Sequence, residues 1–282
     1  MINHKHLEIR THLVIVTGTD SPIRDRNEEF ISLVLSTGSV ISGITYINVR
    51  TYNRNTLIGK GKIDELKKTI SEEAFDLLVF SHDLIASQER NLEKILCCPV
   101  IDRTRLILDI FAKRAQSAAG KLQVELAQLN HLSTRLVRGW THLERQKGGI
   151  GLRGPGEKQL ETDRRLLGNR IKSIKARLKK IEVQRAVNRK SRMKSAKTVA
   201  LVGYTNAGKS TLFNAITSSE TYVADQMFAT LDPLFRPLKS INKKQVIVSD
   251  TVGFIRDLPE TLIQAFLSTL EELCSADLIL HV

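Results

Sequence analysis

The sequence predicts an α/β protein with three parts: a small N-terminal α/β unit, a long antiparallel helical hairpin, and a second α/β unit that is incomplete. Strand-like and helix-like segments alternate up to residue 106, and apolar residues then recur at helical spacing. Later in the chain, a glycine-rich loop joins a strand-like run to a helix-like one. The expected boundaries are residues 1–106, 107–196 and 197–282.

The N-terminal unit is expected to alternate strands with helices. Its apolar runs are short, as buried strands usually are, and amphipathic segments separate them. Such alternation is typical of a small α/β unit. We expect strands over 13–16, 40–49, 77–80 and 99–101, and helices over 28–35, 63–71 and 86–96.

Two long helices are expected in the middle of the chain, because apolar residues recur there every three or four positions. The glycine-rich segment 148–156 interrupts this pattern, so it should form the tip of an antiparallel hairpin. Residues 185–196 show no apolar period and are expected to be a linker. The two apolar stripes comprise Leu122, Leu126, Leu129 and Leu136, and then Leu167, Ile171, Ile174, Leu178 and Ile181.

The net charge of +13 is concentrated in the helical region. Residues 101–195 contain 24 lysines and arginines but only 8 acidic residues. A solvated helical surface is the usual explanation of such charge, but an excess of this size favours a polyanion such as RNA as partner.

Composition also predicts the cellular compartment of the protein. Apolar runs are too short for a membrane span, and the polar N-terminus lacks the features of a secretory signal. The spacing of Cys97, Cys98 and Cys274 suits neither disulfides nor zinc. We therefore expect a cytoplasmic protein with reduced thiols. A monomer is also expected.

A phosphate-binding loop is predicted after the apolar run 199–202. The motif G-x-x-x-x-G-K-[ST] lies here between a strand-like and a helix-like segment, which disfavours a simple glycine turn. Backbone N–H groups would surround phosphate oxygens, Lys209 would reach the β- and γ-phosphates, and Ser210 would ligate Mg²⁺. The predicted nucleotide-binding residues of this P-loop NTPase motif are Gly203, Tyr204, Thr205, Asn206, Ala207, Gly208, Lys209 and Ser210.

A second motif, D-x-x-G, follows the strand-like run 245–248 and comprises Asp250, Thr251, Val252 and Gly253. An aspartate at the end of a strand can bridge to Mg²⁺, often through water, and the glycine N–H can sense a γ-phosphate. The spacing behind the phosphate loop supports this interpretation of Asp250 and Gly253.

A switch segment is expected between the two motifs, in a stretch without clear periodicity. It comprises Phe228, Ala229, Thr230, Leu231 and Asp232. Thr230 would give Mg²⁺ a second hydroxyl when a γ-phosphate is present, and Thr221 is the alternative. Lys209, Thr230 and Gly253 are thus the predicted catalytic residues, and Ser210 and Thr230 the predicted metal ligands.

Several longer runs resemble the HflX family of GTPases over nearly the whole chain. They are residues 102–111, 120–129, 148–157 and 160–165, and they are far more specific than a phosphate loop. The resemblance implies a protein that binds GTP and GDP, hydrolyses GTP with Mg²⁺, and binds the large ribosomal subunit and its RNA. It further implies a place near the peptidyl-transferase centre and a role in separating stalled ribosomes under stress.

One position bears on the rate of hydrolysis, and two departures qualify this resemblance. Phe254 stands where Ras-like GTPases have a glutamine that orients the attacking water, so hydrolysis should be slow until another group positions the water. Residues 234–236 replace the threonine pair that is usual in the family. The motif that reads guanine is expected beyond residue 282, so we expect this chain to be a fragment or an interrupted reading frame.

Two smaller features allow two interpretations each. The segment Gly59-Lys60-Gly61-Lys62 could lie against a phosphate or form a simple tight turn. Trp140 and His142 could stack on a base, although packing of Trp140 between helices is the more common arrangement.

Other functions are also compatible with parts of the sequence. The strongest alternative is a ribosome- or RNA-docking protein that no longer cycles nucleotide. An ATP-using RNA-remodelling enzyme would need a phosphate loop in the N-terminal half, and no strong pattern is found there. A metabolic P-loop kinase would leave the basic hairpin and the switch elements unexplained.

Overall fold

The computed structural model describes residues 9–18, 23–73, 75–144, 155–217, 227–228, 234–238, 245–259, 262–263 and 273–282. They belong to two compact units. One comprises residues 1–107 and 134–148, and the other comprises residues 108–133 and 149–282. The described part of the chain contains no helix that is long and apolar enough to cross a bilayer.

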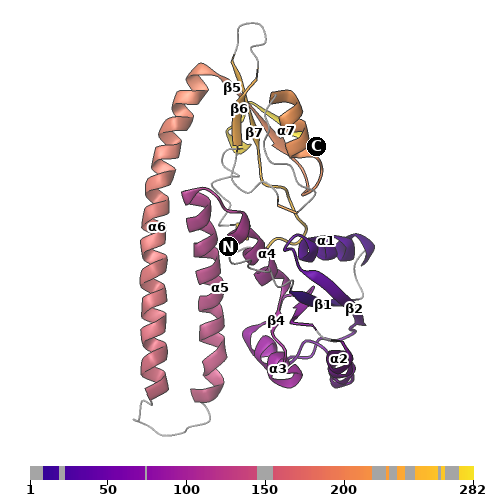
Figure 1. Cartoon of the computed structure of the whole chain (residues 1–282). Coiled ribbons are helices and arrows are strands. Elements are labelled where there is room, and N and C mark those ends of the chain that lie inside the picture. The colour runs from indigo at the N-terminus through magenta and orange to yellow at the C-terminus, as the bar shows by residue number, and fades with distance from the viewer. Residues whose placement is uncertain are drawn as a thin grey trace, which may run out of the picture. The chain divides into compact units, whose positions relative to one another are not determined.

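The first unit is built on a four-stranded parallel sheet with the strand order β2-β1-β3-β4 (Figure 1). The strands and helices alternate as the sequence predicts, and the strand over 77–80 and the helix over 86–96 have the predicted bounds. In chain order the elements are β1 (Arg10–Thr17), α1 (Ile23–Leu35), β2 (Val40–Asn48), α2 (Lys60–Glu72), β3 (Leu77–Phe80), α3 (Ala86–Leu96) and β4 (Val100–Ile101), then the first part of α4 (Arg103–Arg114) and the last part of α5 (Ala118–Glu144).

Both faces of this sheet are buried, as a parallel sheet with crossover helices requires. Side chains alternate between the faces along each strand. On one face, Val14, Leu78 and Phe80 pack with Leu66 of α2 and Leu92 of α3 in one apolar cluster. The residues that alternate with them are also fully buried, and they are Leu13, Ile15 and Val79.

The second unit contains the helical pair and a second sheet. Its sheet has the order β6-β7-β5-β8, with β7, β5 and β8 parallel and β6 antiparallel to β7. The α/β fold class is therefore confirmed in both units. The elements are the rest of α4 and of α5, then α6 (Pro155–Ser195), β5 (Lys197–Val202), α7 (Lys209–Thr217), β6 (Leu234–Pro237), β7 (Val246–Asp250) and β8 (Leu278–His281).

The predicted apolar stripes join the helical pair. Leu122 of α5 and both Ile174 and Leu178 of α6 are buried against one another. At the edge of this seam, Arg170 Nε donates a hydrogen bond of 2.7 Å to Glu125 Oε1. The chain reverses between the two helices, which lie side by side (Figure 1). The glycine-rich tip expected at 148–156 lies mostly outside the described residues.

The linker expected over residues 185–196 is wrong, because α6 continues to Ser195 and β5 begins at Lys197. Lysine, arginine, glutamine and alanine all have high helix propensity, so this segment needs no apolar stripe to be helical. An apolar period reports which face of a helix is packed. Its absence here reflects exposure: Val183 and Val187 are 61% and 58% exposed.

Candidate nucleotide site

The predicted phosphate-binding loop connects β5 to α7 and has the backbone that its glycines allow. Gly208 has a φ of 88° and Asn206 has a φ of 64°, both in the left-handed region that glycine and asparagine tolerate best. The amide of Leu212 donates to the carbonyl of Gly208, which starts α7 directly after the loop. Asn206, Ala207 and Gly208 are exposed. The loop thus presents its backbone to solvent at a helix N-terminus, where anions bind.

Lys209 is the first residue of α7, and its side chain is buried. Only 6% of it is exposed, and its Nζ donates to the carbonyl oxygen of Tyr204 at 2.5 Å. Burial lowers the pKa of the Lys209 ammonium, and the nearby carboxylate of Asp250 opposes that shift. The ammonium is therefore held across the loop by a carbonyl, in a place where a phosphate oxygen would be a much stronger acceptor.

Ser210 and Asp250 meet although 40 residues separate them. Parallel pairing of β5 with β7 places Asp250 opposite Leu201, at the strand ends beside the loop. Ser210 Oγ donates to Asp250 Oδ2 at 2.7 Å, and the Asp250 carboxylate is fully buried. A hydroxyl and a carboxylate oxygen this close together are the hard oxygen ligands that Mg²⁺ prefers, so the residues present fit the ion.

The second predicted motif lies directly against the phosphate loop. Thr251 is buried and its Oγ1 donates to the carbonyl of Leu201 at 2.6 Å. The amide of Phe254 donates to the carbonyl of Gly203 at 2.9 Å, and the amide of Thr205 donates to the carbonyl of Phe254 at 2.8 Å. Tyr204 and Phe254 thereby form a parallel β-bridge. The sequence predicted the motif but not this backbone contact.

Most of the predicted first switch lies outside the described residues, namely Ala229, Thr230, Leu231 and Asp232. The alternative ligand Thr221 does as well. Phe228 is described, and only 2% of it is exposed. Its ring meets that of Phe111 edge to face with centroids 4.5 Å apart. Phe228 therefore anchors the start of the segment through its side chain, a role that its sequence context did not indicate.

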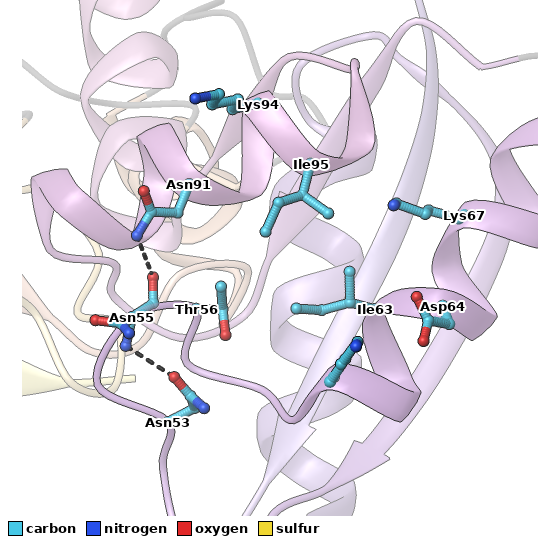
Figure 2. Close-up of a pocket in the computed structure, with 10 residues that line it drawn as sticks. Asn53, Asn55, Thr56, Ile63, Asp64, Lys67, Asn91, Lys94 and Ile95 are labelled. Atoms are coloured by element: carbon cyan, nitrogen blue, oxygen red, sulfur yellow. Dashed lines mark hydrogen bonds between the residues drawn. The ribbon is translucent and has the colours of Figure 1, made fainter.

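The Gly59-Lys60-Gly61-Lys62 segment forms the start of α2. Gly59 is the N-cap residue, and Lys62 pairs with Glu65 one turn later at 2.7 Å. A pocket of about 480 Å³ opens between this helix end, the loop over 53–56 and α3 (Figure 2). Its lining combines three lysines and three asparagines with two isoleucines and two other polar residues: Asn53, Asn55, Thr56, Lys60, Ile63, Asp64, Lys67, Asn91, Lys94 and Ile95.

Sequence reasoning missed a buried ionic cluster in the first unit. Arg135 Nη2 donates to Asp102 Oδ2 at 2.6 Å, and Arg135 also pairs with Glu89. Only 1% of Asp102 is exposed, and it also accepts hydrogen bonds from the amides of Leu84 and Arg105. Nothing in the local sequence marks this pairing, because each partner alone resembles an ordinary surface charge.

Trp140 and His142 lie on the same helix as Arg135, but their side chains are outside the described part.

Three models of protein families match successive parts of this chain. The model described as "GTP-binding GTPase N-terminal" matches residues 24–112, and "GTP-binding GTPase Middle Region" matches residues 114–192. The model described as "50S ribosome-binding GTPase" matches residues 198–282, which include the phosphate loop and Asp250.

Curated relatives extend the match over the whole chain. The GTPase HflX of Escherichia coli is 56% identical over 276 residues, which cover 96% of this chain and 64% of that protein. The GTPase HflX of Lacrimispora saccharolytica is 47% identical over 284 residues, covering 100% of this chain and 67% of that protein. The chain thus spans less than two thirds of the length of the Escherichia coli relative and 67% of the length of the Lacrimispora saccharolytica relative.

A solved structure shares the fold. The crystal structure of a GTP-binding protein from the archaeon Sulfolobus solfataricus in complex with GDP matches with a TM-score of 0.53 and 24% identity. The match covers 97% of this chain and 70% of that chain. The family rests on the curated relatives and on the three family models, which follow one another along the sequence. They show that the chain belongs to the HflX family of GTPases.

Proposed function

We propose that this chain is the nucleotide-binding and RNA-binding part of a cytoplasmic GTPase that associates with the large ribosomal subunit and helps to split or rescue stalled ribosomes. One observation carries the nucleotide half of the proposal. Ser210 Oγ and the buried Asp250 carboxylate lie 2.7 Å apart beside the phosphate loop, next to the buried ammonium of Lys209. Relatives named GTPase HflX support guanine as the base.

The residues of the site have different proposed roles, which follow from their chemistry. The exposed loop backbone over 206–208 would bind the phosphates of GTP or GDP, and Lys209 would exchange its Tyr204 carbonyl for β- and γ-phosphate oxygens. Ser210 would hold Mg²⁺, with Asp250 bound to it directly or through water, and Thr230 is proposed as the further ligand. Bound there, Mg²⁺ would offset the negative charge on the phosphates.

The hydrolytic step needs a positioned water, and the chain offers no hydrogen-bonding side chain at residue 254. Phe254 is 43% exposed and has a hydrocarbon ring, so it cannot orient water as glutamine does. The Gly253 N–H is proposed to contact the γ-phosphate. We therefore propose that hydrolysis is slow in the isolated protein and that the bound ribosomal subunit positions the attacking water.

The RNA half of the proposal depends on charge. The described side chains of α6 include many exposed lysines and arginines: Arg164, Arg165, Arg170, Lys172, Lys175, Arg177, Lys179, Lys180 and Lys190. Such a surface attracts the phosphate backbone of RNA through counterion release. The family model that matches residues 198–282 is described as a 50S ribosome-binding GTPase, which supports the large subunit as the partner.

Nucleotide titration tests the first half. Fluorescent GTP and ATP analogues are titrated with Mg²⁺ against this chain, and against the same chain continued with the C-terminal part of the Escherichia coli GTPase HflX. We expect GTP-selective binding in the continued chain and its loss on Lys209→Ala. If neither chain binds nucleotide, the GTPase proposal fails and a ribosome-docking protein without nucleotide cycling takes its place.

Salt titration tests the second half. We expect the affinity for purified large subunits to fall steeply with salt, and the slope to shrink when Lys172, Lys175 and Lys179 are changed to alanine. The same three positions changed to arginine keep the charge and serve as the control. An unchanged slope in the alanine variant would exclude this face of α6 from the contact with the large subunit.

Light scattering of the free chain tests the expected monomer.

A further inference from the structure

We infer that Phe111 of α4 is a positioning residue for the nucleotide site, because it holds the start of the predicted first switch through the ring of Phe228. The inference rests on the proposed function, since it concerns the binding of Mg²⁺ and a triphosphate by the same site. It goes beyond that function by giving a residue of the helical region, which precedes the phosphate loop in the chain, a part in nucleotide binding.

The two rings form one buried contact inside the second unit. Phe111 is 0% exposed and Phe228 is 2% exposed, and the rings meet edge to face at 73° with centroids 4.5 Å apart. Aromatic pairs favour this arrangement, which depends on ring geometry as well as on apolar area. The contact joins parts of the chain that separate family models match, residues 24–112 and 198–282. The part that carries the phosphate loop thus receives one of its buried contacts from the preceding part.

The backbone of Phe228 shows that this contact holds the chain in place. Its φ is 56°, in the left-handed region that a bulky side chain rarely adopts. Such a conformation is unfavourable by itself and persists only where the surrounding structure holds it. Met227, directly before it, is also buried. Side-chain packing on Phe111, rather than a local backbone preference, therefore fixes the chain at this point.

The position of this anchor in the sequence connects it to the nucleotide site. Thr230, the proposed further Mg²⁺ ligand, follows Phe228 by two residues. Two residues of chain span at most about 7 Å, so a fixed Phe228 limits the volume that the Thr230 hydroxyl can reach. A ligand that is restricted before binding loses less conformational entropy when it binds. Phe111 thereby favours completion of the Mg²⁺ site without contact with the ion or the nucleotide.

The anchor should act on the triphosphate more than on the diphosphate. Thr230 is proposed to reach Mg²⁺ only when a γ-phosphate is present, whereas Lys209 and Ser210 serve both nucleotides. Loss of Phe111 should therefore weaken binding of the triphosphate selectively. A contact that only filled the core would lower the stability of the unit and affect both nucleotides alike.

Nucleotide titration of a Phe111→Leu variant tests the inference. Fluorescent GDP and a fluorescent non-hydrolysable GTP analogue are titrated with Mg²⁺ against this chain continued with the C-terminal part of the Escherichia coli GTPase HflX. We expect the affinity for the GTP analogue to fall by about fivefold or more, and that for GDP to change by less than about twofold. Equal losses for the two nucleotides, or an unchanged affinity for the GTP analogue, would overturn the inference.

Phe80→Leu is the matched control for this titration. Phe80 is also 0% exposed, but it packs in the core of the first unit. Both affinities should remain unchanged in this variant.

A double-mutant cycle tests whether Phe111 acts through Phe228. We expect Phe228→Leu to weaken binding of the GTP analogue as Phe111→Leu does. The double variant should lose no more than either single variant, because one contact can be lost only once. Additive losses would contradict a shared contact.

Chymotrypsin digestion tests the anchor without nucleotide, because this protease cleaves after accessible aromatic residues. In the free chain we expect Phe111→Leu to accelerate cleavage after Phe228 by about tenfold, as local opening exposes that residue. Cleavage after Phe213, which is 0% exposed in the core around β5 and β7, should stay unchanged. Mass spectrometry identifies both products.

The digestion also separates the two possible failures. A parallel rise in cleavage after Phe213 and Phe228 would show that Phe111 supports the fold as a whole, and would contradict the inference. If the unaltered continued chain binds neither nucleotide, the proposed function fails, and cleavage after Phe228 then decides whether Phe111 holds that residue.

Discussion

Ser210 donates its hydroxyl to the buried carboxylate of Asp250 at 2.7 Å, across the end of two parallel strands. The serine comes from the first turn of α7 and the aspartate from the last residue of β7. Two motifs that the sequence separates by 40 positions are therefore one site. The proposed binding of Mg²⁺ and nucleotide depends on this pair.

Changing Ser210 to alanine should uncouple nucleotide binding from Mg²⁺. The variant loses a hard oxygen ligand but keeps the loop backbone and Lys209, so we expect at least a tenfold loss of GTP affinity with Mg²⁺ and little change in EDTA. Fluorescent nucleotide titrations under both conditions measure this. Thr211→Ala, at the exposed neighbouring hydroxyl, should bind normally with Mg²⁺. Equal losses in Mg²⁺ and EDTA would show that Ser210 acts only through the fold.

Changing Lys209 to methionine should weaken nucleotide binding strongly without lowering stability. A charge-assisted hydrogen bond is worth about 1.5–3 kcal/mol, so affinity should fall by roughly 10- to 150-fold or more. Burial lowers the pKa of Lys209, so the charged side chain costs stability at neutral pH. That cost shrinks as pH rises toward the ordinary lysine value of 10.5. Urea unfolding at pH 7 should show an equal or higher free energy of unfolding for the variant, and a clear loss would contradict this.

Arg135 should be essential to the stability of the first unit. Its removal leaves the Asp102 carboxylate, 1% exposed, without its ionic partner, and breaking a buried pair costs about 3–5 kcal/mol. Arg105→Ala is the matched control, because that side chain contacts the same Glu89 but is 49% exposed. The control should cost at most about 1 kcal/mol. Similar losses in the free energy of unfolding by urea for the Arg135 and Arg105 variants would refute the larger contribution of Arg135.

His12 should make stability fall in mild acid. Burial lowers its pKa below the ordinary value of 6.5, although Glu73 at 3.4 Å raises it. The unfolded chain therefore takes up a proton at a higher pH than the folded one, so stability is full above pH 6.5 and declines below it. Changing His12 to glutamine should flatten the decline between pH 7.5 and 5.5 in thermal unfolding. His82→Gln, at a half-buried ring stacked on Tyr52, is the comparison.

The predictable parts of the molecule are those that leave a pattern in the sequence. A short apolar run between turns predicted β3, and an amphipathic segment predicted α3, because burial of one face selects residues at a fixed period. The phosphate loop and the aspartate after β7 were predictable since their chemistry restricts residue type at each position. The sequence thus assigns both Ser210 and Asp250 to the same predicted Mg²⁺ ion.

Other parts leave no such pattern. The residues over 185–195 are helical because of their helix propensity. The absence of an apolar stripe therefore led to the wrong prediction of a linker. The pairing of Arg135 with Asp102 joins charges 33 positions apart that look like solvated residues when taken singly. The bond from Thr205 to Phe254 is made by backbone atoms, which any residue pair supplies.

GTP hydrolysis activated by the ribosome is tested directly by measuring the release of phosphate from GTP as purified large ribosomal subunits are added. The test protein is this chain continued with the C-terminal part of the Escherichia coli GTPase HflX, with Lys209→Ala in the same background as the control. We expect slow release by the free protein, marked acceleration by the subunits, and neither in the Lys209→Ala variant. Release that subunits leave unchanged, or that survives the loss of Lys209, would contradict it.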